Sequence, residues 1–143
     1  IRKMKLLILF LIMFPFFLAN QNPTTLSLQV THVKNDQGLV RVLLFKGESG
    51  FPDDEAKAFK SASVKIKDGK AVVDFGSVPE GTYALSVFHD SQNTGKLRTN
   101  SFGIPRDGYG FSNDAMGMFG PPHFEKAAFK VTAGKNNVYI KLR

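Results

Sequence analysis

Residues 79–90 of the chain, Pro-Glu-Gly-Thr-Tyr-Ala-Leu-Ser-Val-Phe-His-Asp, decide the fold class. Tyr83, Leu85 and Val87 recur at every second position, and successive side chains of a strand point to opposite faces. This spacing predicts a strand over 82–90 with one buried face. The Pro-Glu-Gly group before it is typical of a turn, which places the start of the strand.

The same period of two recurs on both sides of this segment. Asn35–Gly38 and Asp68-Gly69 contain residues that tolerate positive φ, and they predict two hairpin turns. A further turn is predicted at Gly134–Asn137, and the only helical pattern is a weak one at Asp53–Phe59. Short strands and glycine-rich turns predict an all-β, antiparallel two-sheet sandwich of about seven strands. The predicted strands are 26–31, 40–44, 63–67, 70–75, 82–90, 127–131 and 138–142.

Composition excludes several classes of protein. The chain has 143 residues, no cysteine and 14 phenylalanines, and its formal charge is +7. Without cysteine there is no disulfide scaffold, no thiol nucleophile and no zinc site built on thiolates. A hydrophobic fraction of 43% is sufficient for one domain with a buried core.

The N-terminal residues predict a secretory signal peptide over 1–19. Three positive charges within residues 1–5 precede an uncharged apolar run from Leu6 to Leu18. Thirteen residues suit the apolar region of a signal peptide and are short of the roughly 20 that a membrane anchor, the alternative, requires. The sequence thus predicts a secreted or periplasmic protein whose single domain covers 20–143, with no membrane span after removal of the leader.

The predicted mature domain has a modest positive charge. Residues 20–143 contain sixteen basic and twelve acidic side chains, which is a formal charge of +4. The basic residues are dispersed, with no run of five like charges, so nothing favours nucleic-acid binding.

A long segment without alternation, from Asp90 to Glu125, separates the predicted strands 82–90 and 127–131. It is rich in glycine and in large apolar residues, which are unfavourable in water. We therefore expect a packed, Ω-like cap that folds back on the sheets. The large apolar residues between positions 102 and 124 are Phe102, Ile104, Tyr109, Phe111, Met116, Met118, Phe119 and Phe124.

The start of this segment has the spacing of a calcium loop. Asp90, Gln92 and Thr94 offer oxygen atoms at alternate positions before a glycine. Only one of the three is a carboxylate, and Arg98 follows where an acid would help. A hydrogen-bonded turn is therefore the preferred interpretation, with Ca²⁺ binding as the alternative.

Two histidines of the same region suggest a second metal hypothesis. His89 shares the buried face of Tyr83, Leu85 and Val87, so it is either a hydrogen-bonded core residue or a ligand. His123 offers a second imidazole for a Zn²⁺ site. Completing carboxylates would come from Asp90, Asp107 or Asp114, and a site of three histidines would also need His32.

A hydrolytic triad is a further possibility by residue type alone. Ser112, His123 and Asp114 supply a hydroxyl, an imidazole and a carboxylate. The sequence contains no Gly-x-Ser-x-Gly nucleophile-elbow motif, no His-Glu-x-x-His metalloprotease motif and no P-loop motif.

Several ordered motifs resemble a family of secreted bacterial proteins known only as a domain of unknown function. They are the segment 79–90 with its His-Asp pair, Gly95-Lys96-Leu97 with Thr99-Asn100, Gly103–Pro105, Gly108–Asn113 and Phe119–Phe124. The resemblance covers about residues 25–143 and implies an extracytoplasmic sandwich of the transthyretin or immunoglobulin-like kind. Members of that family have more acidic residues and asparagines after the His-Asp pair, and this chain departs from that pattern at Gln92, Thr94 and Arg98.

These observations leave two functional hypotheses. The preferred one is a non-catalytic binding or structural module of the cell envelope, without a cofactor, that meets a partner protein or a glycan through the cap. The alternative is a calcium or zinc protein, or a metal-dependent hydrolase, that uses His89, Asp90 and His123. Oligomeric state is left open. The candidate ligand-binding residues are His89, Asp90, Asn100, Tyr109, Phe111, Ser112, Asn113 and His123.

Overall fold

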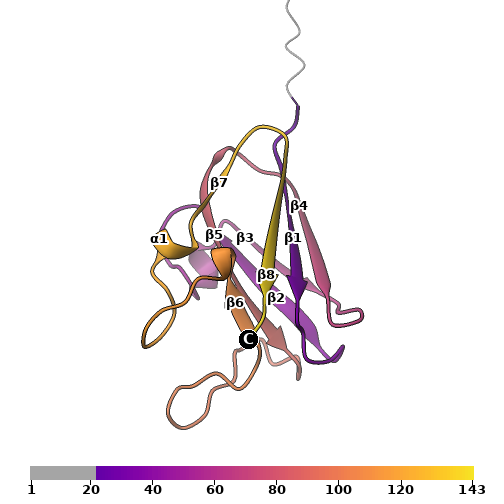
Figure 1. Cartoon of the computed structure of the whole chain (residues 1–143), viewed down its shortest axis with the longest axis vertical. Helices are drawn as coiled ribbons and strands as arrows, with labels where there is room; N and C mark the ends of the chain where they lie inside the picture. The colour runs from indigo at the N-terminus through magenta and orange to yellow at the C-terminus, as the bar shows by residue number, and fades with distance from the viewer. Residues whose placement is uncertain (1–21) are drawn as a thin grey trace, which may run out of the picture.

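The computed structural model describes residues 22–143, so the predicted signal peptide lies outside the described residues. Two β-sheets pack face to face, and short helical turns lie beside them (Figure 1). The elements are, in chain order, β1 (Thr25–Thr31), β2 (Leu39–Phe45), η1 (Glu55–Lys57), β3 (Lys60–Val64), β4 (Ala71–Ser77), β5 (Gly81–Asp90), β6 (Tyr109–Phe111), η2 (Ser112–Asp114), α1 (Phe124–Ala127), β7 (Phe129–Val131) and β8 (Lys135–Lys141).

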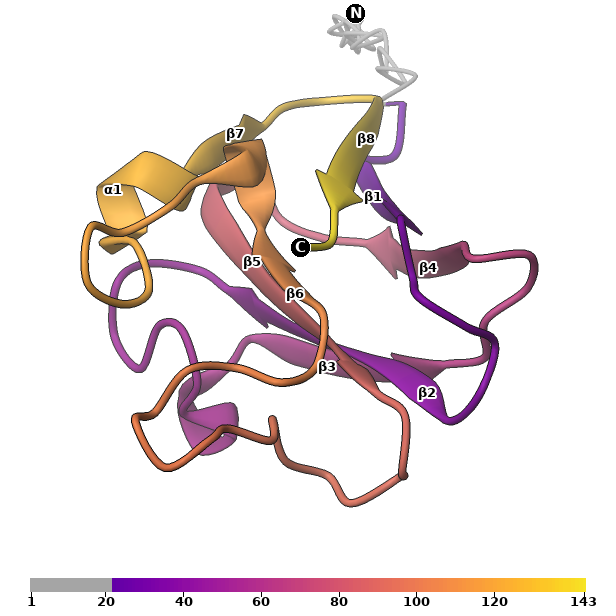
Figure 2. The ribbon, with the colours of Figure 1, turned by 60° about the horizontal axis from the view of Figure 1, so that its bottom comes forward.

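The two sheets have three and five strands. The smaller sheet has the order β4-β1-β8, and the larger has the order β3-β2-β5-β6, with β7 also paired to β5 (Figure 2). All of these pairs are antiparallel except β1 with β8, which is parallel. The prediction of an all-β, two-sheet sandwich is confirmed, with eight strands in the described residues.

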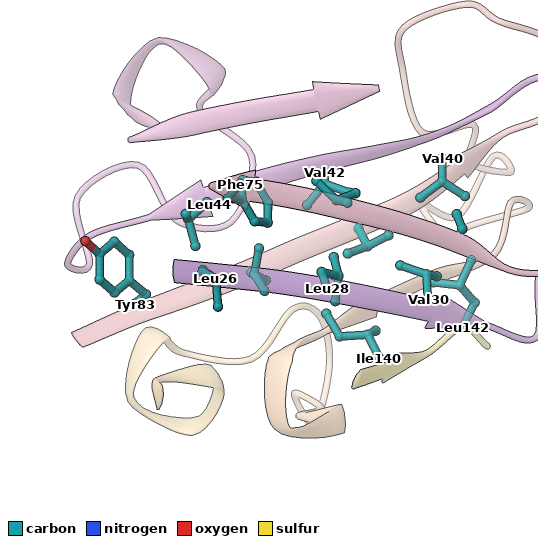
Figure 3. Close-up of a cluster of buried hydrophobic side chains, with 14 of the residues drawn as sticks. Leu26, Leu28, Val30, Val40, Val42, Leu44, Phe75, Tyr83, Ile140 and Leu142 are labelled. Atoms are coloured by element: carbon teal, nitrogen blue, oxygen red, sulfur yellow. The ribbon is translucent and has the colours of Figure 1, made fainter. Parts of the chain in front are cut away.

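The core lies between the sheets and contains the side chains that the alternation placed inward (Figure 3). Tyr83, Leu85 and Val87 are buried as predicted. Burial of a side chain such as leucine stabilises the fold by about 1.5–3 kcal/mol, so this layer supplies much of the stability. The same layer contains Leu26, Leu28, Val30, Val40, Val42, Leu44, Val73, Phe75, Val131, Ile140 and Leu142.

Both predicted hairpins are wrong, because each predicted turn connects one sheet to the other. β1 and β2 belong to different sheets, and so do β3 and β4. The Asp68-Gly69 turn does form, with mutual backbone hydrogen bonds between Lys67 and Lys70, but the chain then diverges. The Asp36 carboxylate accepts hydrogen bonds from the N–H groups of Asp68 and Gly69, both at 2.9 Å, and joins the two crossovers.

Several element boundaries also differ from the prediction. The weak helical pattern at 53–59 is one 3-10 turn, η1, capped by the Asp54 side chain. The predicted last turn ends earlier, because Asn136 and Asn137 already belong to β8. The additional strand is β6, which lies inside the segment that was expected to be a cap.

β6 divides that segment into two loops, which we call the 91–108 loop and the 115–123 loop. In Figures 1 and 2 both extend away from the three-stranded sheet. The expectation of one packed cap is therefore wrong. Only parts of the segment are packed: Asp107, Ser112 and Pro122 are buried, and the rings of Tyr109, Phe111 and Phe124 are half-buried.

Candidate functional site

Asp90, the last residue of β5, holds the beginning of the 91–108 loop. It is 1% exposed, and its carboxylate lies 2.5 Å from Nε of Arg41. It also accepts hydrogen bonds from the N–H groups of Thr94 at 2.8 Å and Gly95 at 2.7 Å. Burial tends to raise the pKa of Asp90, but these donors together hold it below its ordinary value. The carboxylate is therefore ionised, and groups of the same chain donate hydrogen bonds to both of its oxygen atoms.

The predicted calcium ligands consequently form a hydrogen-bonded turn. Thr94 Oγ1 contacts the Asp90 carboxylate and the carbonyl of Lys96, and Gln92 is exposed. The guanidinium of Arg41, which also donates to Asn93, lies where a cation would have to approach Asp90. The geometry favours the turn over a Ca²⁺ site.

A second ion pair closes the other end of the 91–108 loop. Arg98 Nη2 lies 2.5 Å from Oδ1 of Asp107, and Nε of the same guanidinium lies 3.1 Å from both carboxylate oxygens. The hydrogen bonds from Arg98 lower the pKa of Asp107, although burial acts in the opposite direction. The two ion pairs fix both ends of this loop, so the segment between them is held in one position.

Asn100 shapes the tip of this loop. Its side-chain oxygen accepts hydrogen bonds from the N–H groups of Phe102 at 2.9 Å and Ile104 at 3.0 Å. The backbone N–H of Asn100 donates to the Ile104 carbonyl, which closes the turn. This predicted ligand-binding residue therefore orders the backbone at the tip.

Ser112 and Asn113 connect β6 with α1. The Ser112 hydroxyl is fully buried, accepts from Leu85 N–H at 2.9 Å and donates to the Ala127 carbonyl at 2.5 Å. The Asn113 amide donates to the carbonyls of Lys126 and Ala128. A hydroxyl with both functions engaged inside the protein is poorly placed to attack a substrate, so the geometry does not support a triad on Ser112.

His89 is a buried core residue whose ring Nε2 donates to the Gln37 carbonyl at 2.7 Å. His123 lies directly before α1, and the Ser112 hydroxyl links α1 to Leu85 of β5. Leu85 is four residues from His89, which is about 13 Å along the strand. Within residues 22–143 no three histidine, aspartate or glutamate side chains come together to hold a metal ion. The structure thus does not assemble His89, Asp90 and His123.

Tyr109 and Phe111, two of the candidate ligand-binding residues, are half-buried. Phe111 packs edge-on against Phe51, with ring centres 6.0 Å apart, and Phe51 also contacts Phe45 and Phe124. Tyr109 packs against Phe111. These rings form a small aromatic cluster on the outer face of the five-stranded sheet and hold the chain around β6 and α1 against it.

Five of the eight exposed large apolar side chains of residues 22–143 lie on the two loops, where the sequence predicted them to pack, and the other three are Phe59, Val72 and Tyr139. Phe102 and Met118 are each 88% exposed and Phe119 is 98% exposed, with Ile104 and Met116 more than half exposed. Sequence reasoning identified these residues but assigned them to the wrong environment. Their position next to glycine and proline, outside any period of two, was the available signal that no sheet would cover them.

A shallow hollow lies inside the 115–123 loop. Met118, Phe119, His123 and Lys126 line it, together with the glycines and prolines between them. A β-carbon on Gly117 would lie 2.2 Å from the Gly120 carbonyl oxygen, so the chain closes on itself there only because residue 117 has no side chain.

Comparison with known proteins identifies the family. A family model described as an uncharacterized protein conserved in bacteria (DUF2141) matches residues 28–139, and the chain belongs to that family. No curated protein and no solved structure gives a significant match. Within residues 22–143, no helix has the length and apolar character needed to cross a membrane.

Proposed function

We propose that this member of an uncharacterized bacterial family is a non-catalytic binding module of the cell envelope, and that it engages a partner protein through the tips of its 91–108 and 115–123 loops. The observation that carries the proposal is the exposure of large apolar side chains on these loops, with Phe119 at 98% and Phe102 at 88%. Neighbouring large apolar side chains that stay in water, such as Met118 and Phe119, are typical of interaction surfaces.

The polar residues of the same region support binding rather than catalysis. Asp90, Asp107 and Ser112, the best candidates for chemistry, are buried and engaged with backbone groups or arginines of the protein. Their role is to hold the loops, and a loop that is already ordered loses less conformational entropy when it binds.

The chemistry of the loop tips favours a protein partner over a glycan. Phenylalanine and methionine are enriched in the buried centres of protein interfaces. The tips offer Phe102, Ile104, Met118 and Phe119, and the tip polar group of Asn100 is already used by backbone N–H groups. A glycan would need polar partners for its hydroxyl groups beside an aromatic ring.

The envelope location in the proposal rests on the N-terminal sequence. A charged segment followed by thirteen uncharged residues favours export of the domain. A tagged chain recovered from the cytoplasmic fraction, with the leader uncleaved, would contradict this part.

A photo-crosslinking experiment tests the loop surface. A photoreactive phenylalanine analogue replaces Phe119 in cells, and a matched control places it at Tyr139, which is 65% exposed on β8. We expect position 119 to crosslink to one discrete partner protein. We expect position 139 not to crosslink to that protein. A repeat with Phe102→Ser should weaken that crosslink, because both loops contribute contacts.

Two outcomes of the crosslinking experiment would change this proposal. The same crosslinked products from both positions, or products from neither, would show that the loop tips are not a binding surface. A strong crosslink to glycan strands in place of protein would assign the surface to the other partner class.

A further inference from the structure

We propose that the 115–123 loop binds one monovalent copper ion through the thioether sulfurs of Met116 and Met118 and the imidazole of His123. This inference goes beyond the proposed function, because a metal site and an apolar contact surface depend on different atoms of the loop.

The placement of methionine is the first observation. The described residues contain two methionines, Met116 and Met118, and one glycine separates them. They are 51% and 88% exposed, whereas methionine in proteins usually fills gaps in the core. Packing therefore does not account for either side chain, and both sulfurs are accessible.

The shape of the loop is the second observation. Met118 and His123 line the same hollow. Gly117 permits the close approach to the carbonyls of Gly120 and Pro121 that folds the loop back on itself. A long, flexible side chain at residue 116, two positions before Met118, has the reach to provide a third ligand.

His123 also differs from the other two histidines. The His89 ring donates to the Gln37 carbonyl, and the His32 ring contacts the Thr31 hydroxyl. Among residues 22–143 the His123 ring has no hydrogen-bond partner, and the residue is exposed. Its nitrogens are free to bind an ion.

The ligand set selects the metal. Thioether sulfur is a soft, uncharged ligand that favours Cu⁺, and imidazole binds copper as well. Ca²⁺ requires oxygen ligands, and none of the side chains that line the hollow carries a carboxylate. Lys126 also lines the hollow, and its ammonium group repels a divalent ion about twice as strongly as a monovalent one.

Competition with a coloured Cu⁺ chelator under anaerobic conditions tests the proposal on the purified chain. We expect one Cu⁺ per chain, and in the variant with Met116→Leu and Met118→Leu we expect affinity to fall by at least about 100-fold, because soft ligands are lost. His123→Asn should weaken binding in the same way. The matched control is His32→Asn, an exposed histidine outside the loop, which should retain the affinity of the parent chain.

A second measurement identifies the ligands directly. Ag⁺ serves as a probe that cannot change oxidation state, and we expect it to shift the NMR methyl signals of Met116 and Met118. Equal Cu⁺ affinity of the parent chain and the double leucine variant would overturn the proposal, as would Zn²⁺ binding tighter than Cu⁺. All substituted residues are exposed, so thermal unfolding should confirm that each variant folds.

The leucine replacements also separate this proposal from the proposed function. They remove sulfur but keep the apolar surface, so a partner crosslink from Phe119 should persist when copper binding is lost. Loss of both together would show that the partner requires the metal-bound loop.

Discussion

Replacement of Ser112 by alanine tests whether the candidate site is a structural junction. The hydroxyl is fully buried and satisfies two backbone groups, the Leu85 N–H and the Ala127 carbonyl. Each buried group left without a partner costs about 1–3 kcal/mol, so we expect Ser112→Ala to lower the free energy of unfolding by about 3 kcal/mol. For a domain of this size such a loss lowers Tm by about 10–15 °C.

Urea unfolding followed by circular dichroism measures the effect. The matched control is Ser61→Ala on β3, where the side chain is exposed and the change should stay within about 0.5 kcal/mol. A Ser112→Ala variant as stable as the parent chain would refute the structural role. Covalent labelling of Ser112 by a serine-directed fluorophosphonate would support the triad hypothesis instead.

Gly110→Ala should destabilise the fold by about 1–3 kcal/mol in urea unfolding, because the new β-carbon would lie 2.7 Å from a methyl group of Ile140. In the control variant Gly108→Ala, the β-carbon meets only ordinary van der Waals contacts, so the free energy of unfolding should hardly change. Asp107→Asn should speed amide hydrogen exchange in the 91–108 loop about tenfold and in the core strands much less, and equal changes throughout would contradict it. The folded-state pKa values of Asp90 and Asp107 are lowered, so their contribution to stability is present above about pH 4 and is lost as the pH falls through the folded values. Thermal unfolding from pH 7 to pH 2 should therefore show a flat region and then a decline, and a rise on acidification would contradict the sign.

The sequence was sufficient to predict the buried faces of the strands. The alternation around Tyr83 and Leu28 reports which side chains point inward, and those side chains form the core. It does not report which strands pair, because a hairpin and a crossover between sheets produce the same period of two. The Asp68-Gly69 turn shows the ambiguity, since it forms as a tight turn and still sends its two flanking strands to different sheets.

The candidate site was predicted by residue type and not by role. Asp90, Asn100 and Ser112 have the chemistry of ligands, and the structure uses that chemistry to satisfy backbone groups of the same chain. A single sequence does not separate these uses, because a carboxylate that accepts from Gly95 N–H looks the same in sequence as one that holds Ca²⁺. The distinction depends on which donors the fold brings near it, such as Arg41 from a strand 49 residues away.

The exposed loop residues remain the part of the molecule that folding does not explain. Burying a phenylalanine or methionine side chain is worth about 1.5–3 kcal/mol, and the free chain forgoes most of that gain at Phe102, Met118 and Phe119. Two ion pairs, each between a buried carboxylate and a partly exposed arginine, hold the first of these loops in place, so its apolar tip is presented in a defined position rather than collapsed onto the sheets. The free energy of burying such side chains on an ordered loop is gained only when another surface covers them. We therefore expect the partner, and not the fold, to account for the presence of Phe102 and Phe119 on these loops.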